Sequence, residues 1–107
     1  MSNNVRNDSG PPRTPRGNDC ESIYESLQLY SINDKVLEKI KVGDKLSFEV
    51  KVKNGSASLE VLFEKETVGS VIEFQLTDCI QRGREYYAKV INIENGFCII
   101  DAILKAK

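Results

Sequence analysis

Two pairs of neighbouring side chains combine a carboxylate with a second titratable group. Asp78 stands beside Cys79, and Glu85 stands beside Tyr86, so each pair could act as acid and base. The chain of 107 residues contains no histidine, which is the commonest general base and the commonest transition-metal ligand. It also has no glycine-rich phosphate loop and no metal-ligand spacing. We therefore expect no catalytic residues, no cofactor and no metal, and we expect that the protein is not an enzyme.

The three cysteines, Cys20, Cys79 and Cys98, are odd in number, and none of them forms a C-x-x-C pair. This argues against a disulfide framework and against a tetrahedral zinc site. We expect reduced thiols, with Cys79 as a core residue on a helix face. Neither a membrane span nor a secretory signal is evident from the apolar pattern, and reduced thiols are typical of the cytoplasm. The predicted location is therefore cytoplasmic.

Cationic side chains offer a possible contact with nucleic acid. Lys45, Lys51 and Lys53 alternate along one face of a predicted strand. Arg82, Arg84 and Tyr86 cluster at a helix-to-strand junction. Cations neutralise phosphates and aromatic rings stack on unpaired bases. Glutamates lie among these residues and the net charge is −1, so this is the alternative rather than the leading hypothesis.

Two Asn-Gly pairs organise the elements around these side chains. Asn-Gly favours positive φ at both positions of a type I′ turn, which predicts two-residue hairpins at Asn54-Gly55 and Asn95-Gly96. The first turn pairs Val52 with Ala57, and the same register continues to Phe48 opposite Val61. It also sets Glu49 opposite Glu60, with Lys51 placed to screen them.

The second hairpin joins 86–94 to 97–104 and is expected to pair Ile93 with Cys98 and Ile91 with Ile100. Neither of its faces is cleanly polar, so we expect both to be covered. It either lies centrally in a curled sheet or meets a partner with one face. Phe97, Ile99 and Ile103 are the residues predicted to bind a protein partner or a second copy.

The remaining elements follow from shorter patterns. Residues 21–30 alternate as a strand, and a short helix begins within 31–34 and ends before Gly43. A short extended stretch at 68–71 contains Gly69, which marks a bulge or a close backbone approach. Ile72, Leu76, Cys79 and Ile80 lie on one face of a helix over 72–82.

Residues 1–19 contain few apolar side chains and predict a disordered N-terminal tail, followed by one domain over 20–107. The order of elements predicts an α+β fold: a mainly antiparallel curled sheet or small, partly open β-barrel of five or six strands with two short helices.

A Gly-Asp pair, an Ala-x-x-x-Val strand and a Val-Gly step occur within the stretches 42–46, 57–61, 68–71 and 86–93. Together these four stretches resemble the skeleton of a HIRAN domain. The resemblance implies a small barrel related to the OB-fold, and some members of that family bind single-stranded DNA ends. Asn54–Ala57 is shorter than the family's segment and lacks its Asp, and Ser70 replaces an aromatic residue, so the resemblance covers the barrel and not the DNA contacts. Leu27–Leu46 is also similar to small uncharacterised bacterial proteins.

The leading hypothesis is a small, non-enzymatic interaction module, an accessory subunit that binds a protein partner or itself. The missing catalytic residue types, the near-neutral charge and the two apolar faces of the second hairpin all favour it. The alternative is a single-stranded nucleic-acid-binding module of HIRAN or OB-like type.

Overall fold

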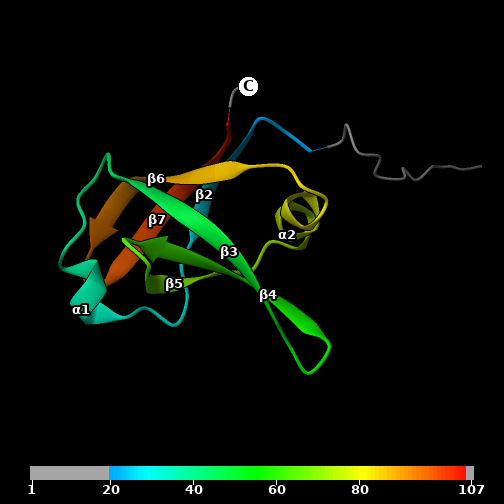
Figure 1. Ribbon diagram of the computed structural model, residues 1–107. Coiled ribbons are helices and arrows are strands. Elements are labelled where there is room, and N and C mark those ends of the chain that lie inside the picture. The colour runs from blue at the N-terminus through cyan, green and yellow to red at the C-terminus, as the bar shows by residue number, and fades with distance from the viewer. Residues whose placement is uncertain (1–19, 106–107) are drawn as a thin grey trace, which may run out of the picture.

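Six antiparallel strands and two short helices make up the part of the chain that the structure describes, residues 20–105. The structure is a computed structural model, shown in Figure 1. The predicted tail, residues 1–19, lies outside the described residues. In chain order the elements are β2 (Ile23–Gln28), α1 (Asp34–Leu37), β3 (Lys45–Lys53), β4 (Ser56–Phe63), β5 (Glu66–Val71), α2 (Phe74–Gln81), β6 (Tyr86–Glu94) and β7 (Phe97–Leu104).

The strands form one sheet in the order β2-β7-β6-β3-β4-β5. The sheet curls until the segment after β2 meets β5, where Tyr30 and Ser70 exchange backbone hydrogen bonds of 2.8 Å in each direction. The backbone N–H of Asn33 adds a third bond, to the carbonyl of Val68. Because the two edges meet only at this short contact among the described residues, the barrel stays open. The predicted α+β class with a partly open antiparallel sheet is confirmed.

The first hairpin, β3 and β4, has the predicted register. Val52 lies opposite Ala57, Phe48 lies opposite Val61, and both turn residues have positive φ, 53° at Asn54 and 78° at Gly55. Periodicity and turn type select the same pairing here, so the inner face receives its apolar side chains without any irregularity.

The second hairpin, β6 and β7, starts in the predicted register and then departs from it. Ile93 lies opposite Cys98, but a bulge between Val90 and Asn92 sets Val90, rather than Ile91, opposite Ile100. The extra residue lets both Val90 and Ile93 face the core, and Ile91 is left 39% exposed. The predicted pairing of Ile91 with Ile100 is therefore wrong, because strict alternation leaves no room for an extra residue.

α1 lies within the predicted bounds, whereas α2 is shorter than the predicted helix over 72–82. Asn33 caps α1 by accepting a hydrogen bond from the N–H of Lys35, and Val36 and Leu37 turn into the core. Glu73 caps α2, so this helix begins two residues later than predicted. Ile72, expected on the buried helix face, precedes the cap and is 65% exposed.

A disulfide joins Cys20 to Cys79, across 59 positions in the sequence, and both side chains are buried. The prediction of reduced thiols at these two positions is wrong, because the sequence does not show that the start of the domain returns to α2. The predicted cytoplasmic location rested partly on free thiols at these positions, and the disulfide removes that support. Cys98 is the free cysteine of the described residues and lies fully buried in β7.

Candidate protein-binding site

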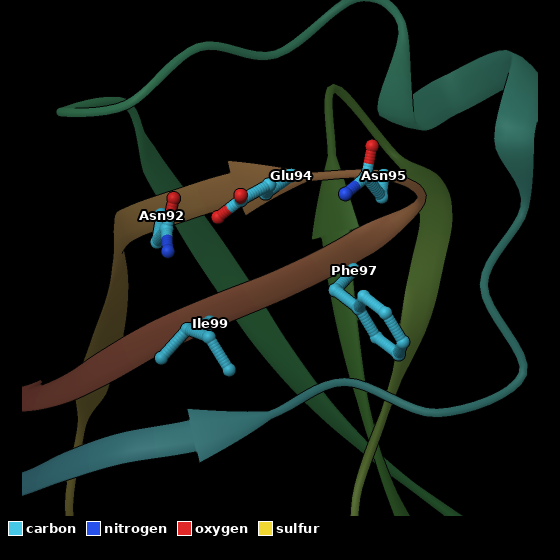
Figure 2. A pocket seen from close by; sticks show the side chains of 5 residues that line it. All are labelled: Asn92, Glu94, Asn95, Phe97 and Ile99. Carbon is cyan, nitrogen blue, oxygen red and sulfur yellow. The ribbon is translucent and has the colours of Figure 1, made fainter.

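A shallow pocket of about 340 Å³ lies at the end of the β6–β7 hairpin. Its lining residues are Asn92, Glu94, Asn95, Phe97 and Ile99. Figure 2 shows the two apolar side chains rising from β7 and the polar ones from β6 and the turn, with the Glu94 carboxylate extending along its strand toward Asn92. The pocket thus has an apolar wall and a polar wall.

Strand alternation explains why the apolar wall reaches the surface. Cys98, Ile100 and Ala102 point into the core and are fully buried, so Phe97 and Ile99 point outward. The helices leave this face to solvent, because α1 packs mainly on β5 and α2 on β3 and β4. The second hairpin lies centrally in the curled sheet, as one predicted alternative has it. Within the described residues no helix covers its outer face, so the other alternative, a partner on that face, stays a prediction.

Phe97 is the most exposed apolar side chain of β7, at 57% of its full surface. A ring in that position loses contact with water when a partner covers it, which favours association. Ile99 is half-buried beside it. These two of the three predicted partner-binding residues lie together in the pocket.

Ile103, the third predicted residue, lies on the same outer face but farther along β7. It pairs with Ile23 of β2 on one side and with Tyr87 of β6 on the other. Asp101 separates it from the pocket and accepts a 2.9 Å hydrogen bond from the backbone N–H of Ser26. Ile103 therefore extends the outer face and does not line the pocket.

The predicted cationic residues of β3 all lie on the outer face of that strand. Lys45 places its Nζ 5.1 Å from the centroid of the Tyr87 ring, a cation–π contact. Lys51 lies 3.6 Å from a carboxylate oxygen of Glu60, as the pairing register predicts. Lys53 ends the strand beside the turn and is exposed.

The other three residues predicted to bind nucleic acid also interact with neighbouring residues of the domain. Arg82 forms a 3.0 Å ion pair with Asp78 one helical turn earlier. Arg84 lies between α2 and β6 and lowers the pKa of Tyr86, although burial raises that pKa overall. Tyr86 itself is only 4% exposed and its hydroxyl donates a hydrogen bond to the carbonyl of Glu21, so no ring face is open to a base.

Three of the four side chains considered for acid–base chemistry likewise make structural contacts. Asp78 holds Arg82, and Cys79 is in the disulfide. Tyr86 packs edge-on against Tyr24 with ring centroids 5.9 Å apart. Within residues 20–105, no three histidine, cysteine or acidic side chains gather as a metal site, and no helix is long and apolar enough to cross a membrane.

Sequence reasoning missed three other exposed apolar side chains. Phe74, Val52 and Ile72 are 80%, 67% and 65% exposed, more than any predicted partner-binding residue. The exposure of Val52 was not apparent from the pattern, because Val52 shares the apolar alternation of β3 with the buried Leu46. The signal for Ile72 was hidden, because its spacing to Leu76, Cys79 and Ile80 matches a helix face that the cap at Glu73 interrupts.

The predicted resemblance to HIRAN domains gains no further support, since comparison of the chain with models of known families, with curated proteins and with solved structures finds no match.

Proposed function

We propose that this chain is a non-enzymatic interaction module that binds a protein partner at the end of the β6–β7 hairpin. The observation that carries the proposal is the exposed ring of Phe97 beside a pocket with one apolar and one polar wall. Interfaces are centred on aromatic anchors in contact with a pocket, and a rim of polar groups surrounds them.

The chemistry of the pocket favours a particular kind of partner segment. An aliphatic side chain would fit against Phe97 and Ile99, and the carboxylate of Glu94 would attract a neighbouring lysine or arginine. Asn92 and Asn95 each offer an amide that can donate and accept, which suits the backbone of an extended segment. The proposed partner therefore presents an apolar residue next to a basic one.

Photo-crosslinking from the hairpin end tests the proposal. A benzophenone amino acid replaces Phe97 in the full chain, and crosslinked partners are identified after irradiation in the native host. Phe97→Ser is then compared with Phe74→Ser for recovery of that partner on affinity resin. Phe74 is the matched control, because it is more exposed than Phe97 and lies on α2.

We expect Phe97→Ser to reduce recovery about tenfold or more, as truncation of a central aromatic anchor does. Phe74→Ser should leave recovery unchanged. Equal recovery with both variants, or loss only with Phe74→Ser, would contradict the proposal. Glu94→Lys is a second test variant. It should weaken binding, because the basic residue of the partner would then face a like charge.

Single-stranded nucleic acid is the second candidate, and one contact supports it. Lys45 over Tyr87 places a cation and an aromatic ring together on the outer face, the combination that holds phosphate and base. Fluorescence anisotropy with short oligonucleotides at two salt concentrations tests this directly. Binding that weakens steeply with salt and disappears in Lys45→Glu would support the candidate; no binding at low salt would eliminate it.

A further inference from the structure

The end of the first hairpin leaves the sheet as a bare two-stranded ribbon. β3 pairs with β6 only from Lys45 to Ser47, and β4 pairs with β5 only from Leu59 onward. Residues 51–58, which we call the arm, therefore have each other as their only strand neighbours among the described elements. Figure 1 shows the arm projecting away from the rest of the sheet. All eight residues are exposed, Val52 among them at 67%.

The arm and the residues leading into it offer an open backbone edge. In a two-residue hairpin the residues that flank the turn, here Lys53 and Ser56, form a hydrogen-bonded pair. Hydrogen-bonded and non-hydrogen-bonded pairs then alternate, so the N–H and C=O groups of Val50 and Val52 point away from β4. No described strand pairs with this edge beyond Ser47. An open edge of this kind is a template for another strand.

The charges on this edge are unbalanced within one copy. Glu49 lies directly opposite Glu60, and Glu60 is already approached by Lys51 at 3.6 Å. Among the described residues, Glu49 therefore faces a like charge and has no ion-pair partner. Lys53 carries an exposed positive charge at the other end of the same edge, also without an ion-pair partner in the described part of the chain.

We propose that two copies of this chain associate by pairing the β3 edges of their arms antiparallel about a two-fold axis at Lys51. In this register Glu49 of each copy lies opposite Lys53 of the other, and Val50 lies opposite Val52. At the axis Lys51 faces Lys51 of the second copy, and the Glu60 carboxylate that lies 3.6 Å from each lysine in its own copy offsets these like charges. The two valines exchange both backbone hydrogen bonds, because their N–H and C=O groups are the ones that face outward. The arrangement is isologous, with the same edge used by both copies.

Neighbouring registers fit less well. Sliding the pairing by two residues toward the turn sets Lys51 opposite Lys53 of the second copy, which places like charges face to face. Sliding it by two residues toward the barrel sets Glu49 opposite Lys51, which Glu60 already holds, and sets Lys53 opposite Ser47, where β6 already pairs with the strand. The register centred on Lys51 stays within the free part of the edge and places each Glu49 opposite Lys53, a cation without another ion-pair partner among the described residues.

The paired arms join two six-stranded sheets into one and reduce the exposure of Val52. The hairpin-end pocket uses β6 and β7 and contributes no residue to this contact. Each copy of the dimer therefore keeps its own pocket, and the two proposals can fail separately. A dimer would present the partner with two identical sites, which increases apparent affinity when the partner also carries two.

Charge reversal with the full-length chain tests the register, and sedimentation velocity over a wide range of protein concentrations gives the oligomeric state. Glu49→Lys and Lys53→Glu each place like charges opposite one another at both symmetry-related positions. Each variant alone should weaken the dimer about tenfold or more. The double variant Glu49→Lys/Lys53→Glu should restore it. An equimolar mixture of the two single variants should form a heterodimer, because both pairs between positions 49 and 53 are then of opposite charge.

The controls separate association from folding. Glu49→Lys removes the repulsion with Glu60 within one copy, so thermal unfolding should show a fold at least as stable as that of the unchanged chain. Lys65→Glu, an exposed charge reversal in the β4–β5 turn, should leave the dimer intact. A monomer at every concentration, a dimer insensitive to both reversals, or a mixture that does not associate would each overturn the proposal.

Discussion

Gly69 is the residue on which closure of the sheet depends most directly. A Cβ at this position would lie 2.9 Å from the carbonyl oxygen of Tyr30 and 3.3 Å from the Cβ of Leu29. Both neighbours belong to the segment that crosses from β2 to β5, and Tyr30 is the residue that bonds to Ser70. The sequence predicted a bulge or a close approach here, and the structure shows both, since the β4–β5 register shifts beside Gly69.

Gly69→Ala should therefore destabilise the fold by about 1–3 kcal/mol, the range for an overpacked site whose neighbour is backbone and cannot rotate away. Urea unfolding at equilibrium measures the change. Ser70→Ala is the matched control, because it removes only a long 3.4 Å side-chain hydrogen bond to the same carbonyl and should cost well under about 1 kcal/mol. Equal stability of Gly69→Ala and the unchanged chain would mean that the two segments are not in contact.

The buried thiol of Cys98 makes stability depend on alkaline pH. Burial raises the pKa of Cys98 from 9.0 to about 11. The unfolded thiol ionises first as pH rises, so this contribution is complete below pH 9.0 and is lost as pH approaches about 11. Burial also raises the pKa values of Tyr24 and Tyr86 above 10.0, and these residues steepen the loss at higher pH.

We expect the free energy of unfolding to fall between pH 9.0 and 11, measured by urea unfolding at a series of pH values. A single thiol contributes a slope of about 1.4 kcal/mol per pH unit at most. Cys98→Ala should be less stable at neutral pH, because it leaves a small cavity, and its stability should fall less as pH rises from 9.0. A slope that does not change in Cys98→Ala would assign the pH dependence to other groups.

At the scale of elements, the hairpins show what alternation can and cannot predict. Both Asn-Gly turns form, because two adjacent positive φ values suit few other residue pairs. The register of β3 with β4 follows from the turn and from one clean apolar face. The register of β6 with β7 fails beyond Ile93, because both faces of β6 carry apolar residues and the pattern does not locate the bulge.

The disulfide is the element-scale contact that no local pattern reveals. It connects the segment before β2 to α2, and the Tyr24 hydroxyl lies 3.9 Å from the Cys79 sulfur. Its position depends on α2 packing against the sheet near the start of β2. The helical periodicity correctly predicted that Cys79 faces the core, but it could not predict that Cys79 is bonded to Cys20 there.

Reduction of this bond should lower the free energy of unfolding by about 2–5 kcal/mol, since the crosslink closes a long loop and restricts the unfolded chain. Urea unfolding with and without dithiothreitol measures the effect. The double variant Cys20→Ser/Cys79→Ser is the control: it should match the reduced protein and should not respond to the reductant. If dithiothreitol leaves the unchanged chain as stable as before, the two cysteines are not linked in solution.

For the whole molecule, the fold class follows from the order of elements, whereas the functional surfaces follow only in part. Phe97 and Ile99 were identified because the sequence shows too many apolar residues for a two-helix domain to cover. The exposure of Val52 was not predicted, because Val52 stands at an inward-facing position in the alternation of β3. The strand continues beyond its pairing with β6, so no neighbouring strand among the described residues covers this side chain. Exposure is a property of the assembled sheet, and alternation gives only the direction in which a side chain points.

Dimer formation through the arms makes the melting temperature of the whole molecule depend on protein concentration. Only folded chains present the paired edge, so association stabilises the folded state and the melting temperature should rise as concentration increases. The rise should shrink at high salt, because the pair between Glu49 and Lys53 of the second copy is close to solvent and screened. Glu49→Lys supplies the reference: its melting temperature should begin to rise only at protein concentrations about tenfold or more higher. Phe97→Ser should retain the full rise, because the pocket and the arm lie on different strands; loss of the rise in Phe97→Ser would place the self-contact at the hairpin-end pocket instead.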